Sequence, residues 1–224
     1  MIVTLDGPAG AGKSTAARAV AKRLGWHYLD TGAMYRAVAW AALDRGVDPA
    51  ASERVAKLAR EITIAFDSGR VFVDGRDVSA AIRTKTITDA TRHVADAAAV
   101  REVMTALQRL VAENADVITE GRDQGTVVFP NAALKIFLTA SPAERARRRC
   151  EEERARGREV SIEEVLAAQN RRDEADANRD VGPLVPAADA IHVITDGLSH
   201  EQVVERLVTL IRAAEAAAAT AGED

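Results

Sequence analysis

Short apolar runs alternate with longer amphipathic stretches along most of this chain. The runs have the length of buried β-strands and lie at residues 2–5, 27–30, 117–120, 134–138 and 190–195. Helical stretches follow the first two runs, at residues 14–24 and 31–45. Apolar strands separated by helices are typical of a parallel sheet that helices cover on both faces. The pattern therefore predicts an α/β fold with a parallel sheet flanked by helices.

Serine residues mark three further helix starts. Each serine is followed three positions later by a glutamate or glutamine, in the pairs Ser141 and Glu144, Ser161 and Glu164, and Ser199 and Gln202. In such a capping box, each side chain accepts a hydrogen bond from the backbone N–H of the other residue. We expect a helix to begin immediately after each serine.

The α/β alternation breaks once in the first half of the chain. Residues 62–66 and 71–73 are strand-like and flank a Ser68-Gly69 turn, which predicts a β-hairpin. A hairpin within an α/β pattern indicates an insertion. We therefore expect one domain over residues 1–224 that carries an inserted subdomain at roughly residues 60–100.

The most specific motif is a phosphate-binding loop near the start of the chain. It reads Gly7-Pro8-Ala9-Gly10-Ala11-Gly12-Lys13-Ser14 and fits the pattern G-x-x-x-x-G-K-[ST], with a predicted strand before it and a predicted helix after it. Backbone N–H groups of such a loop surround an anion, and the helix start adds its positive dipole end. We expect Lys13 to reach the β- and γ-phosphates of a nucleotide, and Ser14 Oγ to bind Mg²⁺.

A phosphate-binding loop alone leaves the reaction open. The chain is either a kinase of a small molecule or a switch or motor that hydrolyses nucleotide. It contains no N-K-x-D motif of the kind with which GTPases read their base. In motor ATPases the corresponding apolar strand usually ends in an aspartate that contacts Mg²⁺, whereas residues 117–119 are followed by Glu120. These two features favour a kinase without deciding the matter.

Two arginines lie where strands are predicted to end. Arg36 follows the second strand, and Arg122 follows the third, next to Asp123. In a doubly wound sheet, the carboxyl ends of the strands face the ligand crevice. One surface arginine is usually solvated, but two at successive strand ends indicate that both point at the site of the phosphate-binding loop.

A second charged cluster lies in the last third of the chain. On the expected helix, Arg172, Asp176 and Arg179 share one face at spacings i, i+4 and i+7. The cluster is either a solvated ion-pair stripe or part of a lid, at about residues 157–185, that folds over bound phosphates and ends at Gly182-Pro183. The spacing does not decide between these interpretations.

An arginine run begins the helix after the fourth strand. Arg145 and Arg149 share a helix face one turn apart, and acidic residues follow at 151–153. We expect most of the run to be solvated, and Arg145 and Arg149 to contact nucleotide.

Composition narrows the possible functions. Lys and Arg number 30 against 34 Asp and Glu, and aromatic residues make up 4%. We therefore expect neither a basic footprint for duplex nucleic acid nor a stacking platform for single strands. Cys150 is the only cysteine, which fits a reducing compartment. The sequence shows neither an apolar run of membrane-spanning length nor a signal peptide, so we expect a cytoplasmic protein.

Other distinctive residues form separate blocks along the chain. They are Asp6-Gly7-Pro8, Asp30-Thr31-Gly32, Tyr35-Arg36, Asp77-Val78-Ser79, Ile82-Arg83-Thr84, Val100-Arg101, Gln108-Arg109, Gly121-Arg122-Asp123, Gly125-Thr126-Val127-Val128-Phe129-Pro130, Arg172-Asp173, Asp176, Arg179, Pro183-Leu184 and Ala188-Asp189-Ala190. In this order they resemble the bacterial-type cytidylate kinases, a family of P-loop nucleoside monophosphate kinases, over nearly the whole chain. The resemblance implies Mg²⁺-assisted transfer of the ATP γ-phosphoryl group to CMP or dCMP, which gives CDP or dCDP.

The resemblance also implies roles for individual residues. The expected catalytic residues are Lys13, Arg122, Arg172 and Arg179, and the expected metal ligand is Ser14. The expected ATP-binding residues are Gly7, Pro8, Ala9, Gly10, Ala11, Gly12, Lys13, Ser14, Thr15, Arg145 and Arg149. The expected substrate-binding residues are Thr31, Tyr35, Arg36, Arg101, Arg122, Asp123, Arg172, Asp176 and Arg179. Among these, Arg36 and Arg122 match positions that hold the CMP phosphate, and Arg101 and Asp123 match positions that read the cytosine. Arg172, Asp176 and Arg179 match positions that contact ribose and phosphates from the lid.

Two positions depart from the family pattern. Where the family commonly has a serine near the base, this chain has Arg92, preceded by Thr91. Either Thr91 supplies the hydroxyl or the base contact is made differently. Glu120 replaces the aspartate often seen before Gly-Arg-Asp.

The expected partners are ATP and CMP or dCMP alone, and we expect a monomer that binds neither nucleic acid nor membranes.

Overall fold

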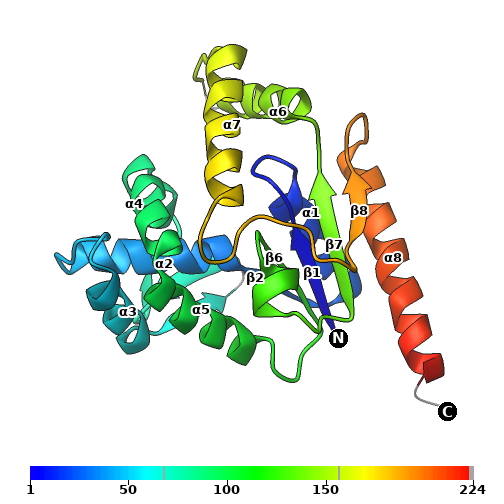
Figure 1. Ribbon diagram of the computed structural model, residues 1–224, viewed down its shortest axis with the longest axis horizontal. Coiled ribbons are helices and arrows are strands. Elements are labelled where there is room, and N and C mark those ends of the chain that lie inside the picture. Colours follow the sequence, from blue (N-terminus) through cyan, green and yellow to red (C-terminus); the bar gives the residue numbers. More distant parts are fainter. Residues whose placement is uncertain (68, 156, 222–224) are drawn as a thin grey trace. The chain divides into compact units, whose positions relative to one another are not determined.

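The chain divides into two compact units. The computed structural model describes residues 1–67, 69–155 and 157–221. One unit comprises Met1–Leu29 and Asn114–Asp224, and the other comprises Asp30–Glu113. Figure 1 labels the helices and strands of both units.

Within the described residues, a five-stranded sheet forms the centre of the first unit. Its strands are β1 (Ile2–Asp6), β2 (His27–Asp30), β6 (Val117–Gly121), β7 (Leu134–Thr139) and β8 (Ile191–Ile194), in the order β2-β6-β1-β7-β8 (Figure 1). β1 pairs in parallel with β6 and β7, and β7 pairs in parallel with β8. The predicted parallel α/β sheet is therefore confirmed.

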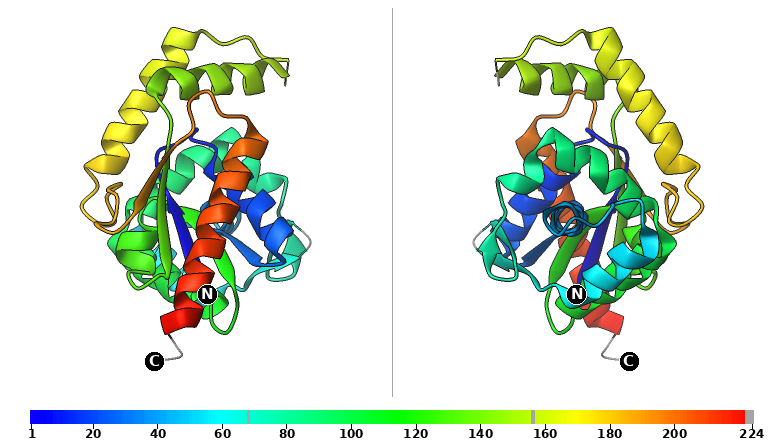
Figure 2. Two further views of the ribbon diagram at one scale, coloured as in Figure 1. Left: turned by 90° about the vertical axis from the view of Figure 1, so that its right-hand side faces the viewer. Right: turned by 90° about the vertical axis from the view of Figure 1, so that its left-hand side faces the viewer.

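Helices connect and cover these strands. They are α1 (Lys13–Leu24), α6 (Pro142–Ala155), α7 (Ile162–Ala177) and α8 (His200–Ala221), with a π-helical turn η2 (Gln124–Val128). α6 and α7 pack against each other, and both views of Figure 2 show α7 crossing α6 at an angle. β1 leads into the phosphate-binding loop and β6 leads into Arg122, so these neighbouring parallel strands bring both segments to one edge of the sheet.

A small antiparallel sheet lies in the second unit. Its strands are β3 (Ile64–Asp67), β4 (Arg70–Val73) and β5 (Arg76–Asp77), with β4 between the other two. The surrounding helices are α2 (Thr31–Asp44), α3 (Ser52–Glu61), α4 (Lys85–Asp96) and α5 (Ala98–Val111), with a 3-10 turn η1 (Ala81–Arg83). The predicted hairpin is present as β3 and β4, whereas Ser68 of its predicted turn lies outside the described residues.

This second unit is wider than the insertion expected at residues 60–100, because it spans Asp30–Glu113. Within it, α2 packs against β4, and α3 packs against α5. These helices have the same amphipathic period as helices of the main sheet. The sequence pattern therefore shows the hairpin but not which helices surround it.

The capping serines all accept the expected hydrogen bond. The distances from the backbone nitrogens of Glu144, Glu164 and Gln202 to the hydroxyls of Ser141, Ser161 and Ser199 are 3.2, 3.4 and 3.2 Å. At Ser199 the box is reciprocal, since the Ser199 N–H donates to Gln202 Oε1 at 2.8 Å. At Ser141 the N–H donates instead to the carboxylate of Asp196 at 2.9 Å, so the predicted reciprocal bond is wrong there.

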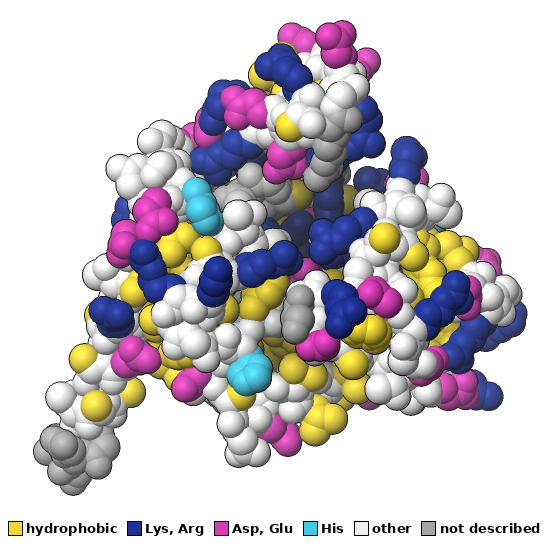
Figure 3. Space-filling model, turned by 180° about the vertical axis from the view of Figure 1, so that it is seen from behind, with side chains coloured by type: hydrophobic (Ala, Val, Ile, Leu, Met, Phe, Trp, Pro, Cys, Tyr) yellow, Lys and Arg dark blue, Asp and Glu magenta, His cyan; other side chains and the backbone are white. Residues whose placement is uncertain are grey.

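Charged side chains of both signs are spread over the surface. On the face shown in Figure 3, Lys and Arg are interspersed with Asp and Glu, in line with the total of 30 basic and 34 acidic residues. Many form short-range pairs, such as Arg147 with Glu144 and Glu151. Exposed pairs of this kind contribute little stability. No helix in the described ranges is long and apolar enough to cross a membrane.

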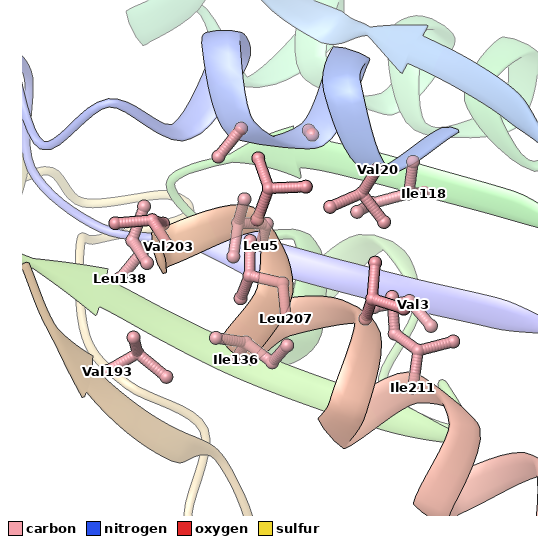
Figure 4. Close-up of a cluster of buried hydrophobic side chains, with 14 of the residues drawn as sticks. Val3, Leu5, Val20, Ile118, Ile136, Leu138, Val193, Val203, Leu207 and Ile211 are labelled. Carbon is pink, nitrogen blue, oxygen red and sulfur yellow. The ribbon is translucent and has the colours of Figure 1, made fainter. Parts of the chain in front are cut away.

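The core of the first unit fixes the orientation of β1. Val3 and Leu5 of β1 point toward Val20 of α1 and toward Leu207 and Ile211 of α8, and all five are fully buried (Figure 4). Burying a side chain of this size stabilises the fold by about 1.5–3 kcal/mol. The strand that leads into the phosphate-binding loop is therefore firmly held.

The opposite side of β1 receives the turn η2. Thr4 alternates with the core residues of β1 and is also fully buried. A Cβ at Gly125 would lie 2.8 Å from Thr4 Oγ1, so a side chain there would collide with the strand. The absence of a side chain lets the turn after Arg122 and Asp123 pack directly on β1.

Candidate active site

The phosphate-binding loop passes close to β7 and turns directly into α1. At Gly7, φ is +145° and a Cβ would lie 1.9 Å from the Leu138 carbonyl oxygen, so only glycine fits. Gly12, with φ of 92°, is the N-cap of α1, and Lys13 is the first residue of that helix. The loop thus ends in unpaired helix N–H groups, which suit an anion.

Lys13 is almost fully buried, with 4% of its surface exposed. Its Nζ donates to the Pro8 carbonyl at 2.8 Å, which holds the ammonium group against the loop. Burial, followed by the charge of Arg122, lowers the pKa of Lys13 to about 7. The charge of Arg172 on α7 acts in the same direction. Negative phosphates in the loop would favour the protonated lysine.

Ser14 and Glu120 connect the loop to the end of β6. Ser14 Oγ donates to Glu120 Oε1 at 2.8 Å, and Glu120 is 7% exposed. The Tyr28 hydroxyl donates to the same oxygen at 3.5 Å. The hydroxyl and the carboxylate are hard oxygen ligands of the kind that Mg²⁺ prefers. No group of three or more His, Cys, Asp and Glu residues that could hold a metal occurs in the described part of the chain.

Asp6, the last residue of β1, holds the turn that follows Arg122. Its carboxylate accepts hydrogen bonds from the N–H groups of Gln124 at 2.9 Å and Gly125 at 2.7 Å. Burial raises the pKa of Asp6 to about 6, although both hydrogen bonds oppose the shift. Asp6 was not among the predicted site residues, because one acidic residue at a strand end has no distinguishing pattern.

Asp176 binds two of the predicted arginines. Its carboxylate lies 2.7 Å from Arg122 Nε and 2.7 Å from Arg179 Nη2. Burial alone would raise the pKa of Asp176, but the charges of Arg122 and Arg179 hold it below the ordinary value. α7 ends at Ala177, so Arg179 lies beyond the helix. The prediction that Arg179 shares a helix face with Asp176 is therefore wrong, although the two side chains do meet.

The arginines of α6 lie in different surroundings. Arg145 is 3% exposed and donates to the carbonyl of Ala9, in the phosphate-binding loop, at 3.0 Å. Arg149 instead pairs with Glu152 at 3.1 Å and Glu153 at 2.7 Å. The structure thus places Arg145 at the loop but not Arg149, whose expected contact with nucleotide stays a prediction.

Arg148 is at the loop, although it was not predicted to be a site residue. A Cβ at Gly12 would lie 3.9 Å from Arg148 Nη1, and Arg148 Nη2 donates to the Thr195 carbonyl at 2.7 Å. On a helix, positions i and i+3 share a face as closely as i and i+4 do. The spacing from Arg145 was therefore a signal that could have found Arg148.

In the second unit, Asp30 organises the start of α2. Its carboxylate accepts the Ala33 N–H at 2.7 Å, and Thr31, the first residue of the helix, is 4% exposed. Arg36 Nη2 lies 3.5 Å from the same carboxylate. A Cβ at Gly32 would lie 3.1 Å from Arg36 Nη1, so the small residue makes room for the guanidinium group.

Arg101 lies beside Tyr35 in the same unit. Its guanidinium carbon is 5.8 Å from the centre of the Tyr35 ring, and it donates to the Ala95 carbonyl at 3.1 Å. Thr91, at the position that departs from the family pattern, donates its hydroxyl proton to the Ile87 carbonyl at 2.6 Å. Its oxygen therefore keeps only accepting capacity toward a ligand. Arg92 is exposed.

Each unit gathers part of the predicted site. The first unit holds Lys13, Ser14, Arg122, Asp123, Arg145, Arg172, Asp176 and Arg179. The second unit holds Thr31, Tyr35, Arg36 and Arg101. That both sets bind one substrate stays a prediction.

Comparison with known proteins decides the family. The family model described as cytidylate kinase matches residues 3–213. The chain belongs to the cytidylate kinase family. It is 50% identical over 212 residues to a cytidylate kinase of Rhodopirellula baltica, covering 95% of this chain and 93% of that one. It is 47% identical to a cytidylate kinase of Geobacter sulfurreducens, covering 97% and 95%. The expected family, enzyme class and activity, phosphorylation of CMP or dCMP by ATP, are confirmed.

Other comparisons are less specific. A bifunctional pantoate ligase/cytidylate kinase of Synechococcus is 48% identical, and this chain spans 44% of its length. Among solved structures, a Thermus thermophilus protein matches with a TM-score of 0.51 at 22% identity, over 95% of this chain and 96% of that one. This likeness extends to the fold alone and agrees with the predicted α/β architecture.

Proposed function

We propose that the first unit holds the reacting phosphates between Lys13 and Arg122 while this cytidylate kinase family member transfers the ATP γ-phosphoryl group to CMP or dCMP. The observation that carries the proposal is the buried Lys13 ammonium group, held over the loop by its bond to the Pro8 carbonyl. Arg122 is close enough for its charge to lower the pKa of that lysine. The charges of Glu120 and Asp6 oppose this shift, and bound phosphates would add to their effect by favouring the ammonium form.

The reaction needs positioning and charge neutralisation rather than a nucleophilic side chain. An oxygen of the CMP phosphate forms a bond to the γ-phosphorus, while the bond to the bridging oxygen of ADP breaks and that oxygen keeps the electron pair. The attacking oxygen already carries negative charge at neutral pH, so no general base is required. Developing negative charge is stabilised by fixed cations, which is the usual mode of catalysis in phosphoryl transfer.

We assign ATP binding to the phosphate-binding loop and to α6. The loop N–H groups and the N-terminus of α1 would hold the phosphates. Arg145 and Arg148 lie against the loop from α6, through Ala9 and beside Gly12. Substrate binding is assigned to the residues that the family resemblance indicates: Arg36 and Arg122 for the CMP phosphate, and Arg101 and Asp123 for the cytosine.

Mg²⁺ is the proposed cofactor, and the residues present fit it. Ser14 Oγ and the Glu120 carboxylate are adjacent oxygen donors at the end of the loop. When bound with ATP, Mg²⁺ neutralises charge on the β- and γ-phosphates. In this chain Ser14 would hold the ion, and Glu120 would orient the Ser14 hydroxyl.

The test is ADP release in the presence of ATP and Mg²⁺ with one acceptor at a time, using CMP, dCMP, UMP, AMP and shikimate. We expect rapid release with CMP and dCMP and slow release with the other three. Fast release with another acceptor would indicate a kinase of a different small molecule. Release that no acceptor accelerates would indicate a regulatory nucleotide-binding module.

The partners and location expected from the sequence are proposals as well. First, we expect the protein to be a monomer. Second, we expect it to be located in the cytoplasm. Third, we expect it to bind neither nucleic acid nor membranes. The mixed surface charge supports the absence of a nucleic-acid footprint (Figure 3). Light scattering of the purified protein and a gel-shift assay with duplex DNA at low salt test the first and the third of these statements.

A further inference from the structure

Arg145 ties three segments of the first unit together. Its guanidinium group donates to the Ala140 carbonyl after β7 at 3.1 Å and to the Ala9 carbonyl in the phosphate-binding loop at 3.0 Å. Its third partner is Asp173 on α7, whose Oδ2 lies 2.7 Å away. The Arg145 side chain is only 4% exposed. The Asp173 carboxylate stabilises this buried guanidinium group, because a buried charge without a partner is strongly unfavourable.

A second contact places the same face of α7 on the loop. Gln169 precedes Asp173 by one helical turn, so the two side chains share a face. A Cβ at Gly10 would lie 3.2 Å from Gln169 Nε2 and 3.4 Å from Arg145 Cβ. The loop, Arg145 and α7 are therefore in close contact at consecutive turns of the helix.

The Asp173 carboxylate pairs with Arg145 through one of its two oxygens. Oδ2 forms the ion pair with Arg145, while Oδ1 is buried and has no hydrogen-bond partner among the described residues. Moving α7 away would leave the Arg145 charge with backbone carbonyls alone. The ion pair thus opposes displacement of α7 from the loop.

We propose that Asp173 is a positioning residue, which through Arg145 holds α7, and with it Arg172 and Asp176, in place beside the phosphate-binding loop. The proposal rests on the proposed roles of these α7 residues in the transfer. It requires no contact between Asp173 and nucleotide. Asp173 would act before substrate arrives, by keeping the charged groups of α7 close to the loop in the free protein.

Hydrogen exchange on the nucleotide-free protein tests the structural half of this proposal. Asp173→Ala and Arg145→Ala should each speed amide exchange in α7 by about tenfold or more, while exchange in β1 and β7 stays unchanged. Glu174→Gln is the matched control, since Glu174 is the exposed neighbour of Asp173. Unchanged exchange of α7 in both alanine variants would overturn the proposal.

Steady-state kinetics with ATP and CMP test the functional half. Asp173→Ala should lower kcat by about tenfold and change the KM for ATP little, because the variant displaces α7 without removing a loop contact to nucleotide. Asp173→Asn, which keeps an acceptor for Arg145, should restore part of the loss. In an Arg145→Ala background, Asp173→Ala should cause no further loss of kcat. A loss as large as in the wild-type background would contradict action through Arg145.

The variants also separate this proposal from the proposed function. If wild-type protein shows no CMP-dependent turnover, the proposed function fails, whereas the exchange experiment still reports on α7. If turnover is normal and Asp173→Ala lowers only the melting temperature, Asp173 supports the fold and the positioning role is wrong. If Asp173→Ala does not fold, Asp173→Asn serves for every measurement, with a smaller loss of kcat that should again be absent in the Arg145→Ala background.

Discussion

Lys13 is the residue whose charge should respond most to nucleotide. Its pKa is lowered to about 7 by burial, so the free protein has a mostly neutral lysine at about pH 8 and a protonated one at about pH 6. Bound phosphates raise this pKa, because opposite charge favours the ammonium form. We therefore expect ATP binding to take up close to one proton per site at about pH 8 and almost none at about pH 6.

Calorimetry of ATP binding in two buffers of different ionisation enthalpy measures this uptake. Lys13→Arg is the control, since arginine stays charged at both pH values and should show little pH dependence. If ATP binding to the wild-type protein takes up no proton at either pH value, the assignment of Lys13 to the phosphates is contradicted.

Asp123 is the residue expected to distinguish cytosine from uracil. It is 4% exposed and precedes the turn that Asp6 holds. A carboxylate can accept from the cytosine amino group but faces a carbonyl in uracil, which leaves both groups unpaired. Asp123→Ala should lower the ratio of kcat/KM for CMP over UMP by about tenfold or more and leave the KM for ATP nearly unchanged.

Competition between CMP and UMP in one assay gives this ratio directly. Asp180→Ala, at an exposed acidic position of the same unit, is the matched control. An unchanged ratio in Asp123→Ala would remove Asp123 as the base-reading residue and make Arg92 the next candidate.

The sequence predicts some of these residues well and others not at all. Lys13 and Ser14 are predicted because the chemistry of the loop is encoded by adjacent positions. Asp6 and Asp173 were not predicted as site residues because their partners are distant in the chain. Asp6, for example, binds the N–H groups of residues 124 and 125, a contact that only the pairing of β1 with β6 creates.

At the scale of elements, α7 and the segment after it are the candidates for a lid. Asp176 binds Arg122 and Arg179, so its carboxylate occupies arginines that are expected to bind phosphates. Bound phosphates would compete for these arginines and reorganise the segment. We expect residues 161–185 to gain protection from hydrogen exchange when CMP and a non-hydrolysable ATP analogue are both bound.

Arg179→Ala should lower turnover by about tenfold or more. The arginine side chain is 14% exposed and paired, so a cost of about 1 kcal/mol in the free energy of unfolding is expected as well. Arg171→Ala, which removes an exposed charge from α7, should change neither. Equal exchange with and without ligands, together with normal turnover of Arg179→Ala, would leave Arg122, Asp176 and Arg179 as a structural ion-pair cluster.

Element boundaries follow the sequence where local signals are strong. Every predicted strand of the main sheet lies within one residue of its observed ends, because apolar runs bounded by turns define buried strands. α7 stops at Ala177 rather than at Gly182-Pro183, with Asn178 as its C-cap. Asn178 is a weaker signal for the end of a helix than the Gly182-Pro183 pair. The carboxylate of Asp176 nevertheless binds Arg179, which lies beyond the end of the helix.

At the scale of the whole molecule, the predicted site residues are divided between two compact units. The unit boundaries fall at Leu29 and at Glu113, so the phosphate-binding loop belongs to one unit and Arg36 and Arg101 belong to the other. The sequence reveals this division only in part, since the hairpin marks the second unit but its helices do not. The hydrophobic pattern alone does not identify the substrate. The family resemblance does, because many separate sequence blocks across the chain match the family in the same order.

The activity of this family member is transfer of the γ-phosphoryl group of ATP to CMP. ATP labelled with ¹⁸O in its γ-phosphoryl group, incubated with CMP and Mg²⁺, tests this transfer by mass spectrometry of the products. We expect the label in the β-phosphoryl group of CDP, at a rate lowered by about a hundredfold in Lys13→Ala, which loses a cation from the transferred charge. Label found only in inorganic phosphate, at a rate that CMP does not change, would contradict it.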